Sequence, residues 1–103
     1  MKYRTLGRTG YKVSEIGFGA WQIGWSTQSE EDSIKSLHTA VERGVNFIDT
    51  AAGYGNGKSE KIIGKFIKDL GKRVYITTKI PPLPGIDPPS PYCIARTLPW
   101  RLY

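Results

Sequence analysis

Short apolar segments alternate with helical patterns along the first 80 residues, and this alternation restricts the fold more than any other feature of the sequence. The apolar segments are residues 16–21, 45–51 and 74–80, and residues 29–44 and 59–71 carry the helical patterns. Strands that alternate with helices predict a parallel sheet with right-handed crossovers. We therefore expect an α/β fold.

Both helical segments carry local signals for their ends. Ser29 is suited to cap the first helix, because three acidic residues follow it and favour the helix N-terminus. Gly44 is suited to end that helix, and Ser59 and Gly71 are expected to begin and end the second. The only histidine, His38, lies beside the apolar stripe of the first helix, so we interpret it as a packed or half-exposed helix residue.

The two ends of the chain depart from this alternation. Residues 3–16 are interpreted as two short strands around the "GRTG" turn, which predicts a hairpin. All seven prolines lie in residues 81–99, a composition that excludes a helix or a central strand there. We expect one partial domain over residues 1–80 and an irregular proline-rich tail over residues 81–103, as a frameshifted or prematurely ended reading frame would produce.

Charge and cysteine content restrict the partners and the compartment. The net charge is +6, but the basic residues of the C-terminal part are scattered, so we interpret them as solvated and expect no nucleic-acid partner. The single cysteine, Cys93, excludes an internal disulfide. No apolar run approaches the roughly 20 residues of a membrane span, and the N-terminus has no apolar signal segment. We expect a cytoplasmic protein without a membrane partner.

A glycine-rich loop, "AGYGNGKS" over residues 52–59, admits a phosphate-binding interpretation. It matches the P-loop pattern except that Ala52 replaces the first glycine, and Lys58 and Ser59 would then contact phosphate and Mg²⁺. No later strand ends in an aspartate that would hold magnesium. The dinucleotide pattern G-x-G-x-x-G fails, because Gln22 and Lys58 stand where its last glycine is needed. We expect no metal site.

Three residues near the ends of the predicted strands suggest acid–base chemistry instead. Asp49 lies near the end of the second strand, Tyr54 follows in the loop, and Lys79 lies near the end of the third strand. Active sites in α/β proteins form at the C-terminal ends of the parallel strands, so the three side chains are expected to converge. A tyrosine, with an ordinary pKa of about 10, is a poor proton donor near neutral pH unless a neighbouring ammonium stabilises the phenolate. The aspartate would keep that ammonium charged and oriented.

Residues 44–64, "GVNFIDTAAGYGNGKSEKIIG", closely resemble the N-terminal signature of aldo-keto reductases, and the resemblance extends over residues 1–80 through the hairpin, "IGFGAW" and "VYITTKI". It implies the N-terminal part of a (β/α)₈ TIM barrel, truncated after the leading hairpin and about three of the eight β/α units. It also implies NADPH-dependent reduction of small aldehydes or ketones to alcohols.

The resemblance assigns roles to individual residues of this chain. The implied catalytic residues are Asp49, Tyr54 and Lys79. The residues implied to bind the cofactor are Gly19, Ala20, Trp21 and Asp49. The implied carbonyl pocket is lined by Trp21, Trp25 and Tyr54.

The family's fourth catalytic residue, a histidine after the next strand, has no counterpart in this chain, and neither do the residues of its late phosphate site. The isolated chain is therefore expected to be inactive. A non-catalytic fragment or interaction module is the alternative, with self-association through the edge of an unclosed sheet. The P-loop nucleotide binder is a third interpretation.

Overall fold

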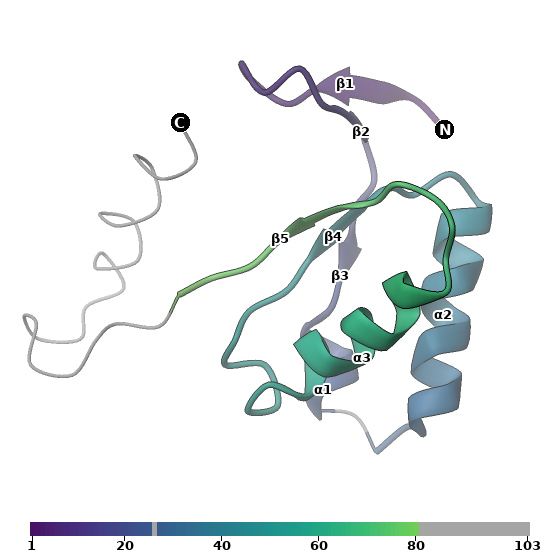
Figure 1. Ribbon diagram of the computed structural model, residues 1–103, viewed down its shortest axis with the longest axis vertical. Coiled ribbons are helices and arrows are strands. Elements are labelled where there is room, and N and C mark those ends of the chain that lie inside the picture. The colour runs from purple at the N-terminus through teal and green to yellow at the C-terminus, as the bar shows by residue number, and fades with distance from the viewer. Residues whose placement is uncertain (26, 81–103) are drawn as a thin grey trace, which may run out of the picture.

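The computed structural model describes residues 1–25 and 27–80, so the predictions for residues 81–103 lie outside the described residues. A three-stranded parallel sheet lies at the centre of the described part, with the strands in the order β3-β4-β5 (Figure 1). These strands are β3 (Phe18–Gly19), β4 (Phe47–Asp49) and β5 (Tyr75–Thr77). The predicted parallel pairing is therefore confirmed.

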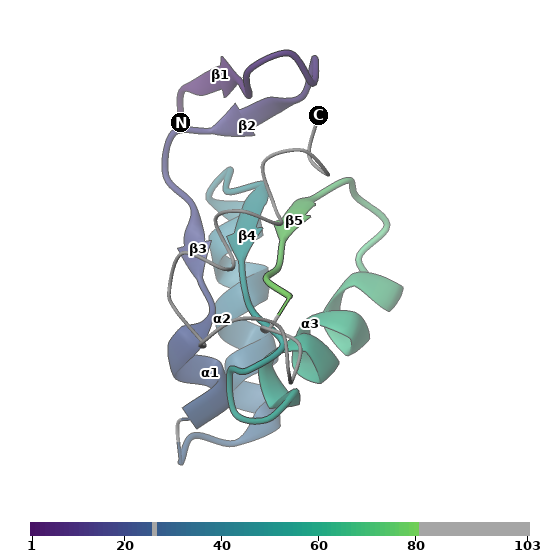
Figure 2. The same ribbon diagram turned by 90° about the vertical axis from the view of Figure 1, so that its left-hand side faces the viewer.

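Two helices join these strands and cover one side of the sheet, as Figure 2 shows from the side of the strands. Helix α2 (Glu30–Glu42) lies between β3 and β4 in the chain, and α3 (Lys58–Lys68) lies between β4 and β5. A third helix, α1 (Trp21–Trp25), follows β3 directly. The expectation that residues 16–21 form one strand was therefore partly wrong, because Trp21 already begins a helix.

The two long helices begin in different ways. The Ser29 hydroxyl accepts a hydrogen bond from the Asp32 main-chain N–H at 3.2 Å, so the predicted cap is confirmed. The cap predicted at Ser59 was wrong, because α3 starts at Lys58 and Gly57, in the left-handed region with φ +93°, takes the cap position. The Ser59 hydroxyl has partners elsewhere in the fold, which are described below.

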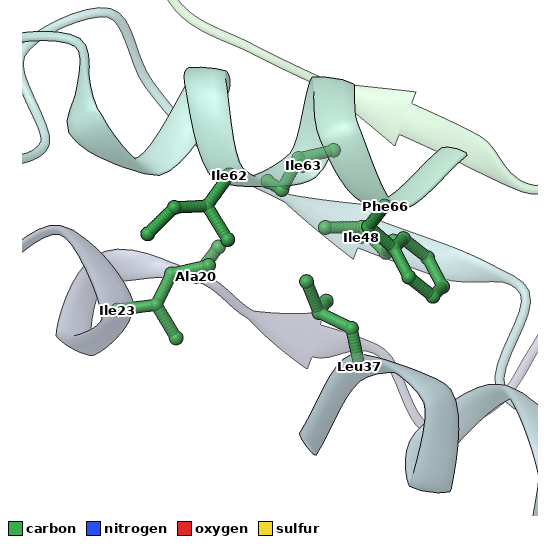
Figure 3. Packing of buried hydrophobic residues seen from close by; sticks show 7 residues of the cluster. All are labelled: Ala20, Ile23, Leu37, Ile48, Ile62, Ile63 and Phe66. Atoms are coloured by element: carbon green, nitrogen blue, oxygen red, sulfur yellow. The ribbon is translucent and has the colours of Figure 1, made fainter. Parts of the chain in front are cut away.

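Buried side chains from all three helices meet the strands in one core (Figure 3). Leu37 of α2 and Phe66 of α3 close over Ile48 of β4, and each is almost fully buried. Burying each of these side chains contributes about 1.5–3 kcal/mol. The ring of His38 meets the ring of Phe66 edge-on at 4.9 Å, which confirms the packed interpretation of this histidine. The core comprises Ala20, Ile23, Leu37, Ile48, Ile62, Ile63 and Phe66.

The hairpin of β1 (Tyr3–Thr5) and β2 (Lys12–Ser14) is antiparallel, as predicted. Asn46, the residue before β4, ties it to the sheet. Its Oδ1 accepts a hydrogen bond from the Ser14 N–H at 2.7 Å, and its Nδ2 donates to the Lys12 carbonyl at 3.0 Å. The hairpin therefore lies near the N-terminal ends of the strands (Figure 1), and their C-terminal ends are left for other residues.

Candidate active site

The ammonium group of Lys79 is the centre of a cluster at the C-terminal ends of the strands. Its Nζ donates to Asp49 Oδ1 at 2.9 Å, to the Tyr54 hydroxyl at 3.2 Å and to the Thr50 carbonyl at 3.0 Å. The three side chains that the strand-end argument selected are thus brought together, although 30 residues separate Asp49 from Lys79.

Strand register explains the convergence. Asp49 is opposite Thr77 in the parallel pairing of β4 with β5, and the Thr77 hydroxyl donates to Asp49 Oδ1 at 3.0 Å. Successive side chains of a strand point to opposite faces. Because Ile48 faces the helices, Asp49 projects from the other face of the sheet. Lys79 follows Thr77 by two residues, which returns its side chain to the same face as Asp49.

The surroundings of Lys79 keep it protonated. Burial lowers its pKa, but the hydrogen bonds and the charge attraction to Asp49 and Tyr54 outweigh this effect and raise the pKa above its usual value. The side chains of Lys79 and Asp49 are 35% and 49% exposed, so a ligand can reach them. The Lys79 ammonium can therefore stabilise negative charge on the Tyr54 oxygen when that oxygen gives up its proton.

The buried hydroxyl groups of Thr50 and Ser59 form a hydrogen-bonded chain next to the cluster, and the sequence pattern did not predict it. The Ser59 hydroxyl donates to the Ala20 carbonyl at 2.9 Å, since a carbonyl oxygen only accepts. The Thr50 hydroxyl, 2.8 Å from Ser59 Oγ, is then the donor in the second hydrogen bond. Ser59 is completely buried, and the chain joins the ends of β3 and β4 to α3.

These contacts also bear on the P-loop interpretation. The main-chain N–H groups of Lys58 and Ser59 donate to the carbonyls of Gly55 and Tyr54, each at 3.2 Å. The loop thus uses these donors, and the Ser59 hydroxyl, within its own fold. This arrangement favours a supporting role for residues 52–59 over a phosphate cradle. The described residues include no group of three or more His, Cys, Asp and Glu residues that could hold a metal ion.

Two tryptophans lie at the ends of α1, and each is about half exposed. The ring centroids of Trp21 and Trp25 are 6.5 Å apart. Next to Trp21, a Cβ built on Gly19 would meet nothing within 4 Å, so this strand end has open space beside Asp49. Ala20, in contrast, is fully buried, and its main-chain N–H and carbonyl already bond Asp49 and Ser59. Ala20 therefore supports the strand end and presents no polar group to a ligand.

A hollow of about 580 Å³ lies elsewhere on the described surface and does not include Asp49, Tyr54 or Lys79. Four lysines of α3 line it, and Lys65 forms an ion pair with Glu30 at 2.6 Å. We interpret it as the solvated face of that helix. No helix within residues 1–25 and 27–80 is long and apolar enough to cross a membrane.

Comparisons with known proteins agree on one family. The model of the aldo/keto reductase family matches residues 15–97, which extends past Ile80 into the proline-rich segment. An aldo-keto reductase of Bacillus subtilis is 44% identical over 84 residues, which are 77% of this chain and 25% of that protein.

Solved structures show the same relationship. The holo form of an aldo-keto reductase from Bacillus halodurans superposes with a TM-score of 0.70 at 32% identity, over 79% of this chain and 26% of that one. An aldo-keto reductase from Klebsiella pneumoniae, solved in complex with NADPH, has a TM-score of 0.64 at 30% identity, over 71% of this chain and 26% of that one. The chain therefore spans about a quarter of the length of these relatives.

Proposed function

The chain belongs to the aldo/keto reductase family, and we propose that residues 1–80 supply the proton-donating part of an NADPH-dependent carbonyl reductase. Family membership makes the hairpin, the three parallel strands and their helices the N-terminal part of a (β/α)₈ barrel. In such barrels, active sites form at the C-terminal ends of the strands, which is where Asp49, Tyr54 and Lys79 meet.

The position of the Lys79 ammonium is the observation on which this proposal depends. It lies 3.2 Å from the Tyr54 hydroxyl and 2.9 Å from Asp49. Tyr54 would donate its hydroxyl proton to the carbonyl oxygen of the substrate as the carbonyl carbon is reduced, and the product would be the alcohol. Lys79 would stabilise the tyrosinate that remains, and Asp49 would hold Lys79 charged and in place.

The residues around the cluster fit the cofactor that the family implies. Open space beside Gly19 lets a flat ring approach the strand end, and the half-exposed Asp49 and Trp21 border that space. When bound there, NADPH would supply a hydride to the carbonyl carbon. Trp21 and Trp25 would offer apolar surface to the rest of the substrate, which favours small aldehydes or ketones with an apolar group.

The reaction would belong to a complete barrel rather than to the 103-residue chain alone. The chain has one histidine, His38, and its ring packs against Phe66 instead of lying beside Tyr54.

As a second candidate function, the fragment would associate with another copy of itself. Within the described residues β3 and β5 are edge strands, and such edges readily pair with other chains. Size-exclusion chromatography with light scattering would detect that association, and a strictly monomeric chain would contradict it.

A chimaeric barrel tests the proposed reaction. Residues 1–80 would replace the matching segment of the Bacillus subtilis relative, and NADPH oxidation would be followed with 4-nitrobenzaldehyde. We expect Tyr54→Phe to abolish turnover and to leave NADPH binding unchanged, because phenylalanine keeps the ring and removes only the proton. Tyr11→Phe is the matched control, since this exposed tyrosine stacks on Tyr75 and lies before β2 in the hairpin. Turnover above a tenth of the parent rate in Tyr54→Phe would contradict the proposed role.

A further inference from the structure

We infer that Gly24 and Gly55 are positioning residues, and that the direct contact of their main chains sets the distance between Tyr54 and Lys79. Gly24 lies within α1 and Gly55 lies in the loop immediately after Tyr54. The inference rests on the role proposed for Tyr54, but the contact itself can be measured without any activity.

The two main chains are too close for a side chain at either position. A Cβ on Gly24 would lie 2.8 Å from both the carbonyl carbon and the oxygen of Tyr54, and 3.0 Å from the Gly55 nitrogen. A Cβ on Gly55 would lie only 2.1 Å from the Gly24 carbonyl oxygen. All these atoms belong to the main chain, so no side-chain rotation can relieve the overlap. A side chain here must move α1 or the loop.

Helix α1 is held against the core by two buried contacts, so we expect the loop to move instead. Ile23 is buried in the core and faces Ile62 of α3 (Figure 3). The Ala20 carbonyl, just before the helix, accepts the buried hydrogen bond from Ser59. Moving α1 outward would break both contacts. A Cβ on Gly24 would therefore push on the carbonyl of Tyr54.

That displacement reaches the candidate active site directly. The main chain of Tyr54 is held by its N–H to Ala51 and by its carbonyl to the Ser59 N–H, each at 3.2 Å. The Tyr54 hydroxyl is 3.2 Å from Lys79 Nζ, already at the long end of hydrogen-bond distances. A shift of about 1 Å would separate the two groups, and displacements of this size are costly in catalytic sites. Asp49 and Lys79 come from the sheet and would stay paired.

The direction in which Gly24→Ala changes the thermal midpoint distinguishes this close contact from the ordinary preference of helices for alanine. Alanine is normally favoured over glycine inside a helix. Because Gly24 has no positive φ, Gly24→Ala adds no backbone strain and tests the close approach alone. We expect a lower thermal midpoint in Gly24→Ala. Gly53→Ala and Gly64→Ala are matched controls, since a Cβ at either site meets nothing within 4 Å and neither glycine has a positive φ.

Nuclear Overhauser contacts in the isotopically labelled 103-residue chain provide the decisive test. We expect a contact between the Tyr54 ring and the Lys79 ε-methylene in the parent and in Gly53→Ala, and its loss in Gly24→Ala. The main-chain N–H of Thr50 donates to the Thr77 carbonyl at 2.8 Å. Slow hydrogen exchange of this amide would therefore show that the sheet remains folded in the variant. An undiminished Tyr54–Lys79 contact in Gly24→Ala would overturn the inference.

Two further outcomes keep the test decisive. If Gly24→Ala does not fold, the parent chain alone decides: the α-protons of Gly24 and Gly55 must show a strong contact, and its absence would overturn the inference. In the chimaeric barrel, Gly24→Ala should lower kcat more than tenfold and leave the KM for NADPH unchanged. A barrel without Tyr54-dependent turnover would contradict the proposed function and would leave the measured Gly24–Gly55 contact standing.

Discussion

Replacing Ser59 with alanine tests the buried hydroxyl chain beneath the candidate active site. The Ser59 hydroxyl donates to the Ala20 carbonyl at 2.9 Å and lies 2.8 Å from the Thr50 hydroxyl. All three residues are at most 1% exposed, so water cannot take the place of the missing group. Ser59→Ala would therefore leave the Thr50 hydroxyl buried without this partner, and the Ala20 carbonyl would lose the hydrogen bond from Ser59 but keep its position before α1, where a carbonyl accepts the first main-chain bond of a helix.

The expected loss of stability follows from these two groups. The unpaired hydroxyl costs about 1–3 kcal/mol and the lost hydrogen bond to the carbonyl about 0.5–1.5 kcal/mol, so we expect Ser59→Ala to lower the free energy of unfolding by about 2–4 kcal/mol. This is a large part of the roughly 5–15 kcal/mol that stabilises a typical domain. With a denaturant slope near 1 kcal/mol per molar urea, the unfolding midpoint should fall by about 2 M or more.

Urea unfolding followed by far-ultraviolet circular dichroism measures this loss. Ser36→Ala is the matched control, because the Ser36 hydroxyl only bonds the Asp32 carbonyl one turn earlier on the exposed side of α2, at 3.0 Å. The control should change stability by less than about 0.5 kcal/mol. If Ser59→Ala matched Ser36→Ala, the hydroxyl chain would have no structural role, and the residue would again be open to interpretation as a phosphate-loop serine.

Three other changes have definite expected outcomes. Because the pKa of Lys79 is raised in the folded protein, its charge adds stability that is fully present below the ordinary lysine pKa of about 10.4 and is lost as the pH rises through the folded-state pKa. The parent should therefore have a higher urea midpoint than Lys79→Met at neutral pH, and this difference should vanish in strong alkali. The Ser33 hydroxyl is buried and has no hydrogen-bond partner among the described residues, so Ser33→Ala should raise the thermal midpoint or leave it unchanged, and a clear fall would contradict this. Asn46→Ala removes the two side-chain bonds to the hairpin and keeps the bond from the main-chain N–H to the Ser14 hydroxyl, so amide exchange should become faster in residues 3–14 and stay slow in β4, whereas uniform loss of protection would refute a local role.

The elements with strong local signals were predictable. The Ser29 cap, the acidic first turn of α2 and the apolar stripe that includes Leu37 are all encoded within a few residues of each other, and the structure confirms them. The convergence of Asp49 with Lys79 was also predictable, although the two residues are far apart in the chain. Parallel strands place their C-terminal ends at one edge, so the strand assignment alone brought these side chains to the same place.

The features that position Tyr54 depend on contacts that no local pattern reveals. Ser59 follows Gly57 and Lys58 and precedes an apolar stripe, which is a usual context of a helix cap, yet its hydroxyl bonds a residue 39 positions earlier. Helix α1 was missed because two of the seven residues 19–25 are glycines, which lower helix propensity. Gly24 is nevertheless required inside that helix, because the main chain of the loop passes within 3 Å of where its Cβ would be. The residue types that we propose as catalytic can therefore be recognised in the sequence, whereas the close approach that we infer to position Tyr54 is visible only in the fold.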